Sequence, residues 1–181
     1  MVRSRVALAA FSAAMTASAS CQAEQLISEV RIGMLSQGDG LLTNDKENGL
    51  SVNGEILFRS PDLLNAIGAP RPHIGASVAT DEDSTSQFYA GLTWEKRFFR
   101  RYFVDGGFGV AVHDGETGPE EDSSNNSFLG CRALFRLSAD AGYLFTERLS
   151  ASAHFEHISN ANLCNENEGL DNLGVRLGYR F

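Results

Sequence analysis

Long apolar runs and proline are both scarce in this 181-residue sequence. After residue 23, no apolar run reaches the roughly 20 residues that a membrane-spanning helix needs. If the mature chain is a membrane protein, it must therefore be a closed β-barrel, because only helices and barrels satisfy every backbone group in lipid. Proline occurs 4 times and glycine 18 times, and short alternating runs are separated by polar, turn-rich stretches.

Positive charge is also scarce, with 15 Lys and Arg residues against 23 Asp and Glu residues. Residues 1–23 have the pattern of a secretory signal. Met1–Arg5 is basic, Val6–Met15 is mostly apolar, and Cys21–Ala23 places small residues before a predicted cut ahead of Glu24. We expect a cleaved signal peptide over residues 1–23 and one mature domain over residues 24–181. A membrane anchor helix and a lipidated Cys21 are the alternatives.

Cleavage would remove Arg3 and Arg5 and take the formal charge from −8 to −10. No basic patch for nucleic acid would remain, so no nucleic-acid partner is expected. Cys131 and Cys164 would be the only cysteines left. In an exported protein such a pair indicates a disulfide, with two unlinked small apolar residues as the alternative.

Alternation of apolar and polar residues predicts an all-β protein with eight strands. We place them at residues 26–36, 49–59, 71–80, 86–98, 101–113, 128–145, 149–160 and 169–181. The polar faces carry many charges: Glu29, Arg31, Glu55, Glu95, Asp105, Arg132, Arg136, Asp140, Glu156, Arg176 and Arg180. Charges so numerous are too costly for a dry core but can pair across a polar lumen. We therefore expect an eight-stranded antiparallel transmembrane β-barrel with its apolar face toward lipid, and a hydrogen-bonded His154–Glu156 pair inside.

Connections of different length alternate along the chain. Residues 98–101 and 145–148 are tight turns, and 60–70 is a longer turn with Pro61 and Pro70. The intervening connections are mostly longer, polar and acidic: 38–48, 81–85, 114–127 and 161–168. This asymmetry predicts a bacterial outer-membrane protein with short periplasmic turns and longer external loops.

The predicted strand over residues 149–160 carries polar chemistry on its apolar face. His157 and Ser159 end the row that begins with Leu149, and Asp171 begins the apolar row of the next strand. A hairpin over residues 161–168 would bring His157 and Asp171 close to a cross-strand pair. The three residues would then lie toward the outer, cell-surface end of the barrel.

Serine, histidine and an acid in this arrangement suit ester hydrolysis. Ser159 is the candidate nucleophile, His157 its base, and Asp171 the group that orients the base. Asn160, or backbone N–H groups of the following loop, would stabilise the oxyanion. Polar residues that merely face lipid headgroups are the alternative. A disulfide between Cys131 and Cys164 would tether the loop beside this site.

The run His157-Ile158-Ser159-Asn160-Ala161, followed by a short polar loop, Gly169 and Asp171, resembles the active-site signature of the PagL-type lipid A 3-O-deacylases. The motif spans about residues 154–181, and the aromatic end at Phe181 resembles that of outer-membrane barrels. The resemblance implies an eight-stranded outer-membrane barrel with a lipid-facing Ser-His-acid triad. It implies hydrolysis of the ester that links a hydroxyacyl chain to the 3-position of lipid A. The resemblance assigns the acid of the triad to Asp171, with Glu166 and Glu168 as nearby alternatives. Asn162 stands where the family has glycine.

The expected partners are lipid A or lipopolysaccharide and outer-membrane lipid, and a homodimer is left open. No cofactor is implied, and His73, His113 and His154 show no metal-ligand spacing. Two other functions compete with the enzyme. One is a non-catalytic structural or adhesive barrel that works through its acidic loops, and the other is a soluble lipocalin-like barrel with an internal ligand.

Overall fold

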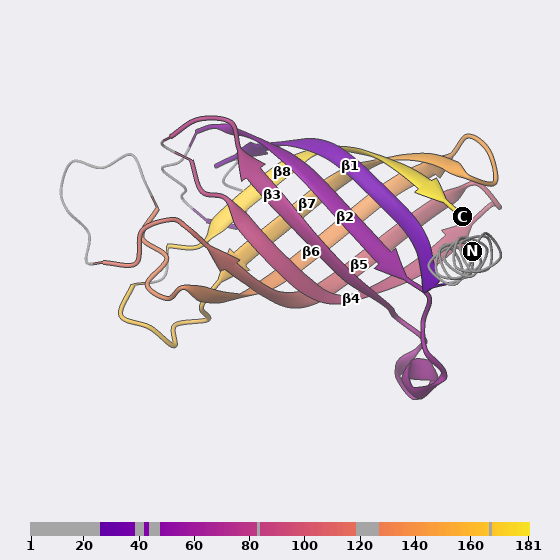
Figure 1. The fold of residues 1–181 in the computed structure, drawn as a ribbon, viewed down its shortest axis with the longest axis horizontal. Helices are drawn as coiled ribbons and strands as arrows, with labels where there is room; N and C mark the ends of the chain where they lie inside the picture. Colours follow the sequence, from indigo (N-terminus) through magenta and orange to yellow (C-terminus); the bar gives the residue numbers. More distant parts are fainter. Residues whose placement is uncertain (1–25, 39–41, 44–47, 83, 119–126, 167) are drawn as a thin grey trace, which may run out of the picture.

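The computed structural model describes residues 26–38, 42–43, 48–82, 84–118, 127–166 and 168–181, and the predicted signal peptide lies outside them. The described strands form one closed antiparallel barrel, in which β8 pairs back with β1 (Figure 1). They are β1 (Ile27–Gln37), β2 (Leu50–Phe58), β3 (Arg71–Ala79), β4 (Gln87–Phe98), β5 (Tyr102–His113), β6 (Ala133–Leu144), β7 (Leu149–Ser159) and β8 (Leu170–Arg180). The predicted eight-stranded antiparallel barrel is confirmed. Among the described residues, no helix is both long and apolar enough to cross a bilayer.

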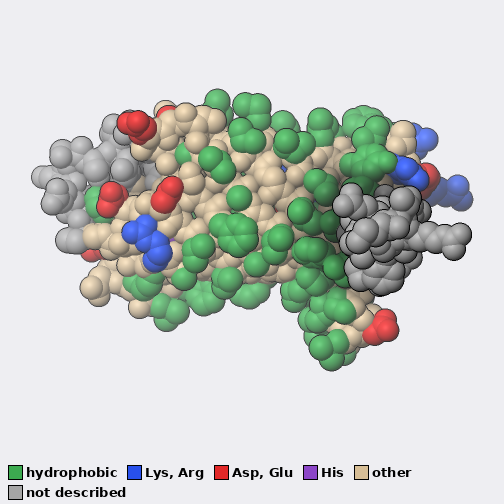
Figure 2. All heavy atoms as spheres, viewed as in Figure 1, with side chains coloured by type: hydrophobic (Ala, Val, Ile, Leu, Met, Phe, Trp, Pro, Cys, Tyr) green, Lys and Arg blue, Asp and Glu red, His purple; other side chains and the backbone are tan. Residues whose placement is uncertain are grey.

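Apolar side chains face outward along the strands. Ile32, Phe88 and Val175 are examples of large apolar side chains exposed on the outer wall. Figure 2 shows hydrophobic side chains spread over this wall and charged groups near its two ends. Because successive residues of a strand point to opposite sides, the same alternation directs polar side chains into the lumen.

Ion pairs fill the lumen. The charged side chains buried in the lumen are Glu29, Arg31, Glu55, Asp105, Arg136, Asp140, Glu156, Arg176 and Arg180. Arg136 Nη2 lies 2.6 Å from Glu156 Oε2, and the guanidinium stands 3.7 Å from the centroid of the Tyr89 ring. Each buried charge therefore has an opposite charge nearby, which offsets part of the cost of removing it from water.

Two expectations about polar residues were wrong. Arg132 is exposed and precedes β6, where its guanidinium donates to the carbonyls of His113 and Gly115, each at 3.0 Å. His154 Nδ1 lies 3.1 Å from the Asp140 carboxylate, whereas His154 Nε2 stays 3.6 Å from Glu156. Asp140 is thus the hydrogen-bond partner of His154, because it is the directly opposed residue on β6.

Strand β6 begins at Ala133 instead of the predicted residue 128. Gly130 adopts a left-handed conformation with φ of 72°, which interrupts the extended backbone. Leu129 nevertheless stays buried and joins an apolar cluster inside the barrel with Tyr89, Ala111, Leu134, Ile158 and Leu170. The cluster explains why Ile158 is apolar on an otherwise polar face of β7.

The start of β1, the end of β8 and the connections between β2 and β3, β4 and β5, and β6 and β7 lie at one end of the barrel, here called the termini end (Figure 1). The first of these connections contains a 3-10 helix, η1 (Asp62–Ile67), which the sequence analysis treated only as a longer turn. The long polar connections lie at the opposite end, here called the loop end. Since β7 ends and β8 begins there, His157, Ser159 and Asp171 also lie at the loop end.

Candidate active site

His157 and Ser159 point the same way because they are two residues apart on β7. Both are half-buried on the outer face of the strand. His157 Nε2 lies 2.9 Å from Ser159 Oγ, within hydrogen-bonding distance. A neutral imidazole with its proton on Nδ1 can accept the serine hydroxyl through Nε2, which is the contact that a base needs before it takes the proton.

Asp171 meets the other nitrogen of the same ring. His157 and Asp171 are directly opposed in the β7–β8 register, and His157 Nδ1 lies 2.7 Å from Asp171 Oδ1. An aspartate is one methylene shorter than a glutamate, and direct opposition across two strands supplies the closer backbone that it requires. The nearby Glu168 has another partner, since its carboxylate accepts from Phe128 N at 2.7 Å.

The carboxylate of Asp171 is capped by the connection between β1 and β2. Its Oδ2 accepts hydrogen bonds from Leu42 N and, at 3.1 Å, from Thr43 N. The side chain is completely buried, while that of His157 is 14% exposed. Two amide donors and an imidazole therefore replace water around the carboxylate on this wall. The sequence analysis missed this contact because residues 42–43 carry no motif that points to it.

Gly169 provides the space that these groups need. It has φ of 73°, and a Cβ at this position would lie 2.7 Å from Thr43 Cγ2 and 3.3 Å from His157 Cε1. Glycine satisfies both the left-handed backbone and the close approach. A larger residue would push either the capping segment or the imidazole out of place.

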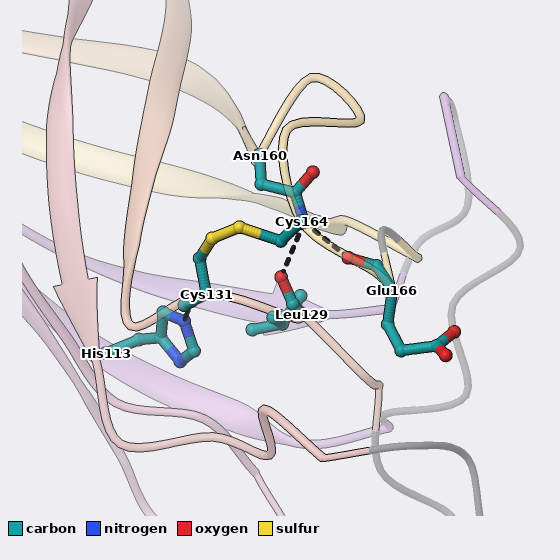
Figure 3. Close-up of a disulfide and its surroundings, with 6 residues drawn as sticks. All are labelled: His113, Leu129, Cys131, Asn160, Cys164 and Glu166. Carbon is teal, nitrogen blue, oxygen red and sulfur yellow. Dashed lines mark hydrogen bonds between the residues drawn. A yellow bond between two sulfur atoms is a disulfide. The ribbon is translucent and has the colours of Figure 1, made fainter.

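Asn160 faces the opposite way from Ser159 and is buried. Its Nδ2 donates to the carbonyl of Leu129 at 2.9 Å and to that of Glu166 (Figure 3). Both amide hydrogens are thus directed to main-chain acceptors, so the side chain does not reach the oxyanion position that the sequence analysis assigned to it. These contacts instead suit a positioning role, in which Asn160 holds the neighbouring loop.

A disulfide reinforces the same junction. Cys131 and Cys164 are bonded, with their Cα atoms 6.0 Å apart, and join the segment before β6 to the connection between β7 and β8 (Figure 3). Phe128 and Glu168 add a main-chain hydrogen bond of 3.2 Å between the same segments. We call these links, together with Asn160, the loop junction. It anchors the loop that follows the serine.

The chain turns sharply after Asn160. Ala161 and Asn162 have φ of 53° and 62°, in the left-handed region that side chains disfavour. Asparagine tolerates this region better than most residues, which fits its presence where the family has glycine. Leu163 N donates to Asn160 O at 3.1 Å and closes the turn. This strained turn lies directly beside the Ser159 backbone.

No group of three or more potential metal ligands occurs among the residues that the structure describes. A depression of about 890 Å³ lies on the outer wall, and Ala141, Ala151, Ala153 and Val175 contribute to its lining. The depression does not include the triad, and Phe98, Tyr102 and Tyr143 line its part nearest the termini end. The chemistry available is thus that of a serine, an imidazole and a carboxylate beside an apolar surface.

The chain is similar to known proteins in sequence and in fold. Residues 71–180 match the family described as lipid A 3-O-deacylase (PagL). Among solved structures, the outer-membrane enzyme PagL is similar, with 16% identity, a TM-score of 0.64, and coverage of 85% of this chain and 100% of that one. No curated protein matches the sequence.

Two further barrels share the fold at low identity. Neisserial surface protein A has 10% identity and a TM-score of 0.56, over 87% of this chain and 97% of that one. The N-terminal barrel domain of Pseudomonas aeruginosa OprF has 14% identity and a TM-score of 0.51, over 86% of this chain and 100% of that one. These similarities concern the fold alone. The family match spans most of the chain and confirms the resemblance seen in the sequence: the chain belongs to the PagL family of lipid A 3-O-deacylases.

Proposed function

We propose that this protein is an outer-membrane esterase that removes the 3-hydroxyacyl chain from the 3-position of lipid A. The observation that carries the proposal is the placement of His157 between Ser159 Oγ, at 2.9 Å, and Asp171 Oδ1, at 2.7 Å. Family membership supports lipid A as the substrate class.

In the proposed reaction, Ser159 Oγ attacks the carbonyl carbon of the ester while His157 Nε2 takes the hydroxyl proton. The tetrahedral intermediate collapses, the C–O bond to the glucosamine breaks, and His157 returns the proton to the departing sugar oxygen. Water then attacks the acyl-serine, with His157 again acting as base, and releases the hydroxy fatty acid. In both halves of the reaction, the Asp171 carboxylate accepts a hydrogen bond from His157 Nδ1–H and stabilises the imidazolium.

Main-chain N–H groups of the turn at Ala161 and Asn162 are our candidates for the oxyanion site. Two features support them. The turn follows the nucleophile directly in the chain, and its two successive left-handed residues are held beside the loop junction. Strained backbone of this kind is often concentrated at active sites.

The position of the triad on the outer wall supports a lipid substrate. An acyl chain of the surrounding leaflet already lies against β7 and β8, so the ester can reach Ser159 without leaving the membrane. With the long loops at the cell surface, the loop end falls in the outer leaflet, where lipid A is found.

Mass spectrometry of lipid A from cells that express the protein tests the proposal. We expect loss of one hydroxyacyl group, and we expect Ser159→Ala and His157→Ala each to abolish that loss. Val78→Ala is the control, because Val78 lies on the outward row of β3, which pairs with neither of the strands that carry the triad. Continued deacylation by both triad variants would exclude the Ser159–His157 mechanism, whereas no deacylation by the unaltered protein would favour a non-catalytic barrel.

A further inference from the structure

The connection between β2 and β3 forms a small ordered element at the termini end. Leu64 N donates to Pro61 O at 2.9 Å, Gly68 N to Asn65 O at 3.2 Å, and Ala69 N to Leu64 O at 2.9 Å. Gly68 ends the 3-10 helix η1 with φ of 90°. The connection therefore holds a defined shape through its own hydrogen bonds.

A tryptophan on the outer wall fixes the direction of this element. Trp94 lies on the outward row of β4, and its Nε1 donates to Ile67 O at 2.9 Å. A Cβ at Gly68 would lie 3.5 Å from the same ring, so the end of η1 packs close to it. Figure 1 shows η1 projecting sideways from the barrel instead of continuing along its axis. In a membrane-inserted barrel, this direction lies in the plane of the bilayer.

The sequence of η1 gives it two apolar rows and one polar row. A 3-10 helix has three residues per turn, so residues three apart share a row. Leu63 and Ala66 form one apolar row, Leu64 and Ile67 form the other, and Asp62 and Asn65 form the polar row. None of the six is buried against the barrel, and Leu63 is 86% exposed.

The apolar surface of η1 is continuous with the lipid-facing wall. Figure 2 shows the hydrophobic side chains of the projecting element adjoining those of the barrel, with acidic atoms on the side toward the termini end. Tyr102, Tyr143 and Tyr179 lie near the same end on the outward rows of their strands, as aromatic residues do at a membrane interface. The level of η1 along the barrel therefore matches the boundary between acyl chains and headgroups.

We infer that η1 is an interfacial anchor that inserts its two apolar rows among the lipids of the leaflet at the termini end. Its polar row, Asp62 and Asn65, faces the headgroups and water. Under the orientation given above, that leaflet is the phospholipid leaflet, on the side of the membrane away from the triad. The anchor requires no deacylase activity and would set the depth and tilt of the barrel.

Site-specific fluorescence in phospholipid vesicles tests this inference. Leu63→Cys and Asn65→Cys, each combined with Cys21→Ser and with the Cys131–Cys164 disulfide left oxidised, would carry the same environment-sensitive fluorophore. We expect the label at residue 63 to show blue-shifted emission, quenching by phosphatidylcholine brominated on its acyl chains, and protection from aqueous iodide. The label at residue 65 is the matched control and should show the opposite behaviour on all three measures.

Heat-modifiable migration on gels would verify that both labelled proteins are folded barrels. The inference is overturned if the label at residue 63 is quenched by iodide as readily as the label at residue 65, or is not quenched more strongly by the brominated lipid. Because neither labelled residue contacts the triad, lipid A deacylation can be measured on the same proteins. Loss of the anchor and loss of the proposed activity are therefore distinguishable results.

Discussion

The proposed chemistry depends most on one carboxylate that is shielded from water, that of Asp171. Asp171 Oδ1 contacts His157, and its Oδ2 accepts from Leu42 N and Thr43 N. These contacts use both oxygens and hold the carboxylate on one side of the imidazole. The ring is thereby oriented with Nε2 toward Ser159, as a base in a serine esterase must be.

Asp171→Asn should preserve this packing but remove the charge that stabilises the imidazolium. We expect the rate of deacylation to fall by about 10²- to 10⁴-fold, with little change in folding. Asp171→Glu should be intermediate, because the extra methylene does not fit a directly opposed pair under an existing cap. Rates measured on purified, heat-modifiable protein check both variants, and full activity of Asp171→Asn would show that the carboxylate does not orient the base.

Much of this site could be predicted from the sequence. The two-residue period of a strand brings His157 and Ser159 to one face, and a hairpin over the intervening loop brings Asp171 opposite. The amide cap from residues 42–43 could not be predicted, because it depends on how a distant connection folds over β8. The direction of the Asn160 side chain was missed because the carbonyls that it binds lie in segments without regular structure.

At the scale of elements, the loop junction joins two connections into one unit beside the triad. The disulfide spans 33 residues and is supplemented by hydrogen bonds from Asn160 and between Phe128 and Glu168. Linking the two connections limits the conformations open to the turn at Ala161 and Asn162. The junction thus stabilises the segment in which we place the oxyanion donors.

Cys131→Ser combined with Cys164→Ser should loosen this segment without dissolving the barrel. We expect the free energy of unfolding to fall by about 2–4 kcal/mol and amide exchange in residues 160–166 to increase, together with a lower rate of deacylation. Hydrogen-exchange mass spectrometry checks the local effect. Ser84→Ala, in the connection between β3 and β4, is the control, and unchanged exchange in residues 160–166 would show that the hydrogen bonds suffice.

The boundaries of seven strands agree with the sequence analysis to within about two residues, since a wall between lipid and a polar lumen imposes alternation along the whole strand. The start of β6 differs by five residues, from 128 to 133. Leu129 is apolar for a different reason, which is that it packs into the cluster at the loop end of the lumen. Over so short a segment, a buried loop residue and a buried strand residue give the same apolar signal in the sequence.

For the molecule as a whole, the charged lumen has two effects. Burying the charges costs free energy, and pairing them constrains the register of the strands. Glu156 accepts from Arg136 Nε at 2.8 Å, Gln87 at 2.6 Å, Asn172 at 2.8 Å and Ser77 at 3.3 Å, so five strands meet at one carboxylate. The outer wall contacts lipid with little specificity, whereas these contacts require one register. The lumen therefore selects the arrangement of strands that places the triad correctly.

Arg136→Met should leave Glu156 without its main counter-charge. We expect a loss of about 3–5 kcal/mol in the free energy of unfolding, measured with urea in phospholipid vesicles. Leu137→Met, at the next position on the lipid-facing side of β6, is the control and should change it by less than about 1.5 kcal/mol. Equal effects of the two substitutions would mean that the lumen contributes no more than the wall.

The amide cap on Asp171 has a consequence for biogenesis. Leu42 and Thr43 follow the first strand, whereas Asp171 lies at the start of the last strand. Their hydrogen bonds can form only after β1 has paired with β8. In a precursor whose sheet is still open, the Asp171 carboxylate would lack these two hydrogen bonds. We therefore expect such a precursor to be inactive toward lipid esters. Under the proposed mechanism, full activity would therefore require the closed barrel.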